Sequence, residues 1–161
     1  MVKKKLDMLS PNLILIIDQI LSNQEICKYL NYNKDNPLTQ PDLILPAKNL
    51  FLKKIFPYEY NPNITMEDCT QLRIYYPSGR IINKAIEDVV VVFDIIVAKT
   101  LWLVNDGKPL LRPYELLKLI YNEYQNKSIS TVGVLSFRGW NYINYNDKFN
   151  GIRFFSSMWT L

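Results

Sequence analysis

Acidic residues are the side chains in this sequence that could do metal-dependent chemistry. Paired carboxylates hold Mg²⁺ in two-metal nucleases, and the candidates here are Glu67, Asp68, Glu87, Asp88 and Asp94. Their spacing matches no specific metal motif, and the two adjacent pairs lie at the starts of expected strands, where charged residues are ordinarily solvated. The sequence therefore predicts no metal site here.

Histidine is absent from the chain. This removes the usual general base, the Ser-His and Cys-His nucleophile pairs and most zinc sites. Cys27 and Cys69 match no metal spacing and are expected to be free thiols. The sequence also lacks a Gly-rich phosphate loop. We therefore expect a non-enzymatic protein with no catalytic residue and no cofactor.

Asp94 lies within the longest β-branched run of the sequence, residues 87–104. Such a run is typical of a strand covered on both faces, and it is too short for a membrane, which needs about 20 apolar residues. Alternation places Val91, Phe93, Ile95 and Val97 on an apolar core face. Asp94 points the other way, and three roles are open: a pair with a cation such as Arg112 or Arg138, a salt bridge between subunits, or catalysis.

Aromatic and basic residues could contact partners. Trp102, Trp140 and Trp159 are not interleaved with Arg or Lys as in a base-stacking platform, so core or interface packing is favoured. Lys3, Lys4 and Lys5 could touch DNA phosphates or form a solvated tail. The net charge of +4 is compatible with nucleic acid but too small to establish binding.

The chain of 161 residues is expected to form a single domain. Its parts are a basic N-terminal arm (1–9), a helical region (10–55), an extended connector (56–66), and a sheet plus helix (67–161). Helices are expected from Ser10-Pro11, after Asn23, over 47–55 and from Arg112-Pro113. Strands are expected over 71–76, 87–104, 132–140 and 149–159, with a weaker strand or loop over 80–85.

Several motifs together resemble a known family. They are Phe56-Pro57-Tyr58-Glu59-Tyr60, Val92-Phe93-Asp94-Ile95-Ile96-Val97, Leu101-Trp102, Asp106-Gly107, Arg112-Pro113-Tyr114, Gly133-Val134-Leu135-Ser136-Phe137 and Asn146-Asp147-Lys148-Phe149. In this order they resemble neck and tail-completion proteins of tailed bacteriophages, over residues 45–161. The resemblance implies a tail terminator-like α+β fold: a curved, mostly antiparallel sheet of about four or five strands, flanked by helices, with an N-terminal helical region.

The resemblance also implies a function. It points to a structural virion protein at the head–tail interface, assembled in the host cytoplasm, that joins the tail tube to the head connector. The subunits would form a homo-oligomeric ring, hexameric or dodecameric, through which DNA passes without sequence-specific binding, and no membrane is involved. The N-terminal helices and the loop 31–46 depart from the pattern, so a head-completion or adaptor protein is an alternative, as is a DNA-binding packaging accessory protein.

Residues that would contact neighbouring subunits can be named from this reading. The interface candidates are Phe56, Tyr58, Tyr60, Asp94, Trp102, Arg112, Arg138 and Trp140. The aromatic connector and the N-terminal arm are the segments expected to reach neighbouring chains.

Overall fold

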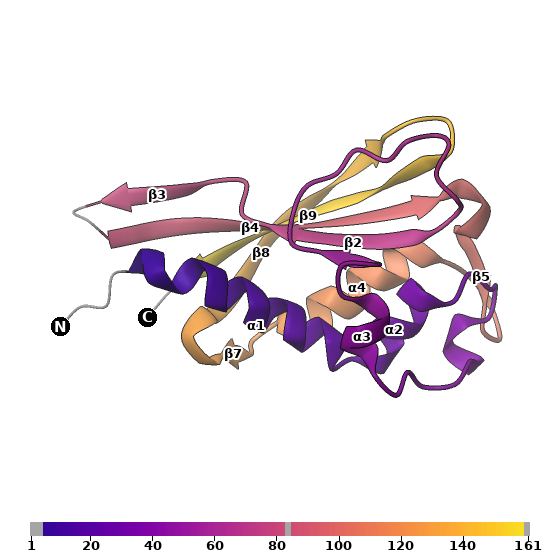
Figure 1. Cartoon of the computed structure of the whole chain (residues 1–161), viewed down its shortest axis with the longest axis horizontal. Coiled ribbons are helices and arrows are strands. Elements are labelled where there is room, and N and C mark those ends of the chain that lie inside the picture. Colours follow the sequence, from indigo (N-terminus) through magenta and orange to yellow (C-terminus); the bar gives the residue numbers. More distant parts are fainter. Residues whose placement is uncertain (1–4, 83–84, 160–161) are drawn as a thin grey trace.

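The computed structural model describes residues 5–82 and 85–159 (Figure 1). Its helices are α1 (Leu9–Leu21), α2 (Gln24–Asn31), α3 (Pro46–Leu50) and α4 (Arg112–Tyr124), with 3-10 turns η1 (Lys5–Met8), η2 (Pro37–Thr39), η3 (Lys99–Leu101) and η4 (Ser130–Val132). Its strands are β1 (Ile55–Phe56), β2 (Thr70–Tyr75), β3 (Gly79–Ile82), β4 (Ala85–Ala98), β5 (Leu103–Asn105), β6 (Pro109–Leu111), β7 (Ser128–Ile129), β8 (Gly133–Asn144) and β9 (Phe149–Trp159).

The helix starts follow local capping chemistry only in part. The Asn23 side chain accepts a hydrogen bond from the Ile26 backbone N–H at 3.1 Å and so caps α2, as expected. The α1 helix begins at Leu9, and Ser10 is therefore its second residue and not its cap. The helix expected over 47–55 ends at Leu50, because Leu52 adopts a positive φ of 57° and Ile55 joins the sheet.

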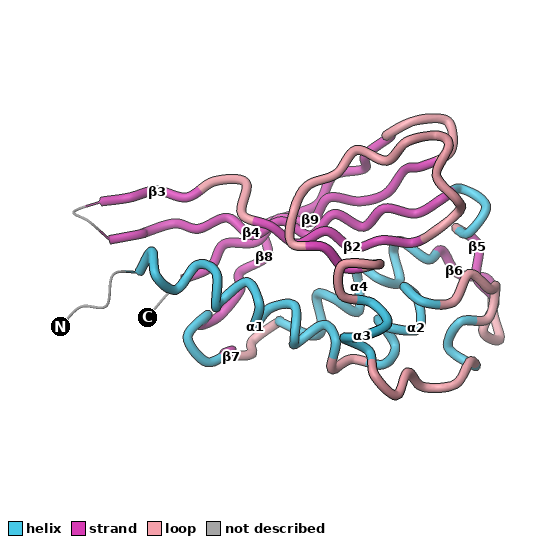
Figure 2. Tube along the Cα trace, in the orientation of Figure 1, coloured by secondary structure: helices cyan, strands magenta, loops and turns pink. Residues whose placement is uncertain are grey.

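The main sheet confirms the α+β class and the mostly antiparallel pairing. Its described strands run in the order β1-β2-β4-β9-β8-β7, with β3 also paired to β4, and it is strongly curled (Figure 2). It therefore has more strands than the four or five expected. The additional strands, β1 and β7, are only two residues long, and segments this short leave no periodic pattern in the sequence. The weaker strand or loop expected over 80–85 is in part the strand β3.

The central strand β4 is shorter at its end than the expected 87–104. It stops at Ala98, whose N–H donates to the Cys69 carbonyl, and η3 follows at once. The remaining apolar residues form β5, which pairs with β6 in a separate hairpin around the expected turn at Gly107. The run of apolar residues continues on both sides of this corner, into β4 and into β5. The sequence pattern therefore does not show where the first strand ends.

The core lies between the sheet and the helices. Val91, Phe93, Ile95 and Val97 are all buried in it, which confirms the core face expected from alternation. The β9 strand runs very close to β4 at Gly151, where a Cβ would overlap the Ile95 backbone. Only glycine fits this position of the sheet.

A two-stranded arm projects from the body of the sheet, with η1 and the start of α1 alongside it (Figure 1). We define the arm as β3 together with residues 85–89 of β4. Gly79 pairs with Val89 but Ile81 pairs with Ile86, so β4 has one extra residue here, as in a β-bulge. Bulges increase local twist, and here the arm leaves the body of the sheet.

Candidate interaction surfaces

Asp94 lies at the centre of a charged row on the sheet face opposite the core. The register places Arg73 of β2 and Arg153 of β9 on either side of it. Arg153 donates two hydrogen bonds to the Asp94 carboxylate, at 2.7 and 3.0 Å, and the Tyr75 hydroxyl donates a third at 2.6 Å. The cation beside Asp94 is therefore Arg153, and not Arg112 or Arg138 as the sequence suggested.

Two groups of this cluster have pKa values that are raised by their surroundings. The hydrogen bonds to Asp94 raise the pKa of the Arg153 guanidinium above its usual range. Burial, and then the hydrogen bond to Asp94, raise the pKa of the Tyr75 hydroxyl. A buried carboxylate held by a cation and a neutral phenol is satisfied within its own chain, so Asp94 has no need of a partner subunit.

The aromatic connector lies on this same face of its own sheet. The Arg73 guanidinium packs against three rings, with centroids 3.6 Å away for Phe56, 4.6 Å for Tyr60 and 5.4 Å for Tyr58. Glu59 forms an ion pair with Arg153 at 3.7 Å. The expectation that this connector extends to neighbouring chains finds no support in this geometry, although the outer sides of Tyr58 and Tyr60 remain exposed.

Further contacts fix the end of the connector. Asn146 donates to the Pro62 carbonyl at 2.8 Å. Lys148 forms an ion pair with Asp68 at 3.1 Å and donates to the Met66 carbonyl. Hydrogen bonds from Thr100 and Lys148 lower the pKa of Asp68. The ion pairs of this charged face thus form within one chain, and we call it the closed charged face. The buried Nη1 of Arg73 has no hydrogen-bond partner among the described residues.

Arg112 is a structural residue at the start of α4. It is buried, and its guanidinium donates to backbone carbonyls of four residues at 2.6–3.1 Å: Tyr29, Tyr32, Lys34 and Leu101. Burial lowers its pKa to about 10. Arg112 therefore ties α4 to the chain after α2 and is inaccessible to another subunit.

The edge of the sheet at β8 is largely unpaired. Residues 128–129 of β7 pair with β8 only at its first two residues, Gly133 and Val134. From residue 135 to residue 144, β8 has β9 on one side and no other described strand on its second side. We call residues 135–144 the open edge. An unpaired edge presents free N–H and C=O groups to any strand that approaches it.

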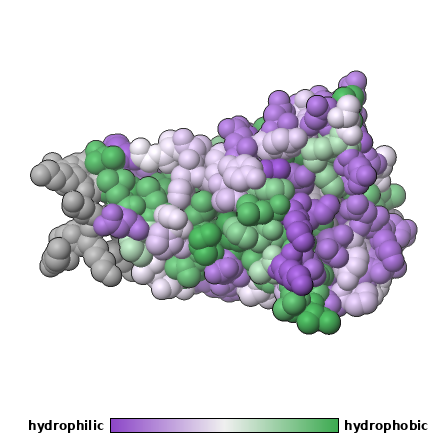
Figure 3. All heavy atoms as spheres, in the orientation of Figure 1, coloured by the Kyte–Doolittle hydropathy of each residue, from purple (hydrophilic) through white to green (hydrophobic). Residues whose placement is uncertain are grey.

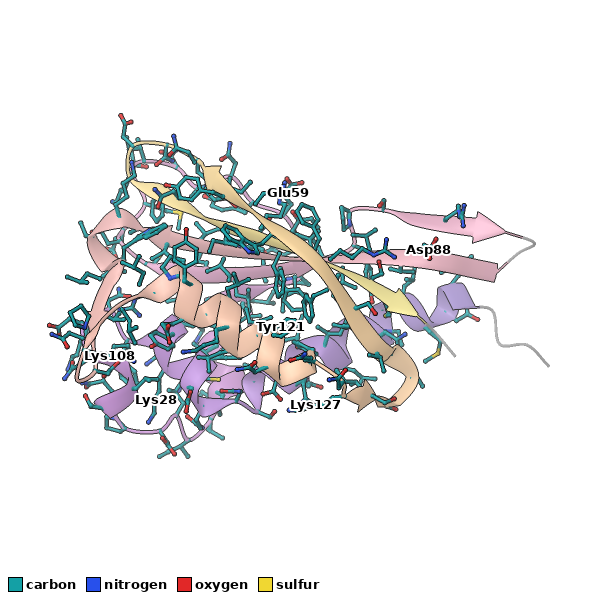
Figure 4. The ribbon with its side chains drawn as sticks, turned by 180° about the vertical axis from the view of Figure 1, so that it is seen from behind. Lys28, Glu59, Asp88, Lys108, Tyr121 and Lys127 are labelled. Atoms are coloured by element: carbon teal, nitrogen blue, oxygen red, sulfur yellow. The ribbon has the colours of Figure 1, made fainter. Side chains whose placement is uncertain are left out.

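An aromatic groove of about 370 Å³ lies between the open edge and α4. Its lining comprises Tyr114, Leu117, Lys118, Tyr121, Phe137, Gly139, Trp140 and Phe154. Phe137 stacks on Phe154 with ring centroids 4.1 Å apart, and Trp140 meets Tyr114 edge-on at 5.8 Å. Trp140 is nevertheless 48% exposed. Figure 4 shows Tyr121 on α4, with β8 running past one side of this helix.

A second hollow, of about 270 Å³, lies where the arm meets η1. Leu6, Leu9, Tyr76, Ser78, Gly79, Ile81, Ile86 and Val89 line it. Ile81 of β3 is 60% exposed. Figure 3 shows hydrophobic residues gathered on the arm and along the strip where α1 meets the sheet. The arm thus has Ile86 and Val89 buried towards the helices, and Ile81 of β3 exposed.

Six of the eight candidate interface residues are divided between two regions, and Arg112 and Trp102 lie outside both. Phe56, Tyr58, Tyr60 and Asp94 share the closed charged face. Trp140 and the exposed Arg138 lie on the open edge, and Trp102, which is partly exposed, packs edge-on against Tyr114. The sequence did not single out Tyr121, Phe137 or Ile81, although the apolar stripe of α4 and the turn before β3 were visible signals. Lys3 and Lys4 lie outside the described residues, and Lys5 begins η1.

Three further features of the described residues concern metal ligands, reactive cysteines and membrane-spanning helices. They contain no group of three or more acidic or cysteine side chains that could hold a metal ion. Cys27 and Cys69 are free and buried, as expected, and burial raises the pKa of Cys27 to about 11, which disfavours a reactive thiolate. None of the helices in residues 5–82 and 85–159 is long and apolar enough to cross a membrane.

Comparison with known proteins gives one result. No curated protein and no solved structure matches the chain. The family model described as YomW matches residues 23–158, from α2 to the end of β9. The name of that family is associated with Bacillus phages, which is consistent with a phage protein but does not specify a neck or terminator role. Because the match covers most of the sequence, the chain belongs to the YomW family.

Proposed function

We propose that this protein is a structural, non-enzymatic subunit of a tailed-phage virion that forms a ring between the tail tube and the head connector. The observation that carries the proposal is the pair of free strands on opposite sides of the described sheet, β3 in the arm and residues 135–144 of β8. A sheet with free strands on both sides can be extended by further copies on either side.

Two different surfaces that meet head to tail generate a ring when the rotation between subunits closes. A two-fold dimer would instead need a single self-complementary surface. In this chain the exposed apolar residues Ile81 and Trp140 lie on two different elements, on the two sides of the sheet. This arrangement supports a head-to-tail contact, and membership of a family with a phage-associated name supports a place in a virion.

The closed charged face fits the same proposal. Its ion pairs are satisfied within one chain, so the fold does not depend on a neighbour to neutralise them. A net charge of +4 gives a mildly positive subunit, which is compatible with a lumen that neither repels nor tightly holds DNA.

The first experiment is the solution mass of the purified chain by light scattering, with negative-stain images of the same sample. A closed ring of six or twelve copies is the expected result. A two-fold dimer or an open filament would overturn the ring. A chain that stays a monomer at every concentration would contradict self-assembly, and salt-dependent DNA binding, lost when Lys3, Lys4 and Lys5 become Ala, would then favour the packaging accessory protein.

A second experiment tests the position in the virion. Gold-labelled antibody against the chain is added to phage particles that have been opened at the neck. The label should be found at the junction of head and tail. Labelling along the tail, on fibres, or on no part of the particle would contradict a neck subunit even if the isolated chain forms rings.

A further inference from the structure

We infer that the open edge of β8 and its aromatic groove receive the arm of a second copy of this chain, with Ile81 entering the groove beside Trp140. This inference rests on the proposed function, because it names the contact that would build the ring. It makes β3 of one copy the strand that pairs with β8 of the next.

The two partners present their apolar residues on the same side of the sheet. Ile81 pairs with Ile86, which belongs to the core cluster and therefore faces the helices. Trp140 pairs with Phe154, which pairs with Phe93 of the same core. Cross-strand partners share a face. If β3 of one copy is added to β8 of another with the sheet continued, Ile81 therefore lies on the groove side and not on the charged side.

The strand directions also agree. The pairs β3–β4, β4–β9 and β9–β8 are all antiparallel, so β3 and β8 run in opposite directions within one chain. A second copy that continues the sheet in the same sense brings its β3 antiparallel to β8. Antiparallel addition of a strand to a free edge is a common mode of recognition, in which main-chain hydrogen bonds supply affinity and side-chain pockets supply specificity.

The β4 strand of the arm has Ile86 and Val89 buried, but β3 is held less firmly. The strand β3 pairs only with β4 among the described residues, and Ile81 is mostly exposed. A two-stranded ribbon is marginally stable in water, whereas three or more strands with an apolar face are stable. Docking on β8 would provide the third strand and would bury Ile81 against aromatic rings.

The charges on the two surfaces are compatible. Arg138 is the only charged residue of β8, is exposed, and forms no ion pair with the described residues. The arm carries Asp88, which is partly exposed and pairs at 3.3 Å with Arg80. An approaching arm therefore brings an ion pair, and not an isolated positive charge, towards an edge whose only charge is positive.

The occupant is a second copy because each chain carries both halves of the contact. One arm and one open edge per chain allow every subunit to give and to receive, so the same contact repeats around a ring. A different protein as occupant would leave the arm of this chain, with its exposed Ile81, unexplained.

The test uses Ile81→Asp, which damages the arm, and Trp140→Asp, which damages the groove. Ile44→Asp is the matched control, because Ile44 is 92% exposed in the loop before α3, far in sequence from both surfaces. Each test variant alone should fall from the ring to the 19.0 kDa of one chain, and the control should keep the mass of the wild type.

An equimolar mixture of the two test variants is the decisive sample. The intact arm of the Trp140→Asp copy can dock on the intact groove of the Ile81→Asp copy, but neither remaining surface can continue the chain. The mixture should therefore form a dimer and nothing larger. The appearance of this dimer also shows that both variants are folded.

The possible failures are distinct. Rings formed by either single variant would overturn the arm contact and leave the proposed ring intact. A mixture that stays monomeric, with both variants folded by circular dichroism, would also overturn it. A wild-type chain that forms no ring would contradict the proposed function and the inference together.

Discussion

Two ion pairs on β4 show how differently one strand is used along its length. Asp94, near the middle of the sheet, is buried and pairs with Arg153. Asp88, six positions earlier in the arm, pairs with Arg80, and both of these side chains are substantially exposed. The first pair is enclosed by strands on both sides and by the aromatic connector, whereas the second is open to water.

This difference separates the part that holds the fold from the part that is free to bind. In the centre, Asp94 and Arg153 form an ion pair within the chain, and Arg73 is buried against the rings of the connector. In the arm and along residues 135–144, the outer backbone edges have no strand partner among the described residues, and Ile81 and Trp140 are exposed. Substitutions in the centre should therefore change stability, and substitutions at the open surfaces should change assembly.

Two glycines test this contrast most strongly. Gly151→Ala should cost about 4 kcal/mol or more and should prevent folding at 37 °C, because the new Cβ would overlap the Ile95 backbone of β4. Gly79→Ala in the arm is the control, since its Cβ would meet only ordinary contacts at 3.6 and 3.9 Å. Urea denaturation followed by circular dichroism measures both. Equal stability of the two variants would contradict the close approach at Gly151.

The ion pairs give the next largest effect. Asp94→Ala should destabilise the chain by about 3 to 5 kcal/mol, because it leaves the Arg153 guanidinium without its buried partner. Asp88→Ala should cost less than about 1 kcal/mol, because its ion pair is screened by water. Thermal unfolding of the two variants at one protein concentration compares them, and similar losses would show that burial does not distinguish the pairs.

Arg112, which is buried at the start of α4, contrasts with Arg138, which lies on the open edge. Arg112→Met should cost about 2 to 3 kcal/mol, because the buried carbonyls that it binds lose their donor. Arg138→Met should change the stability of the single chain by less than about 0.5 kcal/mol, since Arg138 is exposed. Urea denaturation of the two variants checks this order, and a larger loss for Arg138→Met would reverse the assignment.

The smallest effect concerns Tyr29. Burial raises the pKa of its hydroxyl from 10.0 to about 12. Its neutral form is favoured in the folded state, so its contribution to stability is complete below pH 10 and is lost as the pH rises to about 12. Between pH 8 and pH 11 this loss is on the order of 1 kcal/mol. Tyr29→Phe should reduce the alkaline loss of stability by that amount.

Stability of wild type and Tyr29→Phe, measured by urea denaturation at several alkaline pH values, checks the effect. The substitution is mild at neutral pH, because the Tyr29 hydroxyl has no hydrogen-bond partner among the described residues. Parallel pH curves for the two proteins would show that Tyr29 titrates normally. The open edge carries no buried tyrosine hydroxyl like that of Tyr29. The pH dependence of ring assembly should therefore differ from the pH dependence of the stability of the single chain.

Part of the fold could be predicted because it depends on neighbours in sequence. The alternation around Phe93 gave the core face, Asn23 gave a helix cap, and Pro113 in the first turn of α4 gave its start. These features need only the 2.0 and 3.6 residue periods and local hydrogen bonds. The free thiols of Cys27 and Cys69 also followed from composition.

The interaction surfaces could be predicted only in part. Trp140 was chosen because tryptophan is favoured at interfaces, and it does lie on an open edge. Phe56 and Tyr60 were chosen as parts of the aromatic connector expected to reach neighbouring chains, but their rings pack on Arg73 of their own sheet. Residue type alone does not separate these cases, because the same aromatic ring suits a partner surface and a cation in its own chain.

The sequence by itself determined the local elements of this protein, its mixed α+β character and the apolar face of its central strand, because each depends on patterns a few residues long. Only the tertiary structure decided that Arg153, 59 positions away, neutralises Asp94, and that β8 and not β4 lies at the open side of the sheet. Strand order and register bring distant residues together, and no local pattern encodes which strands become neighbours.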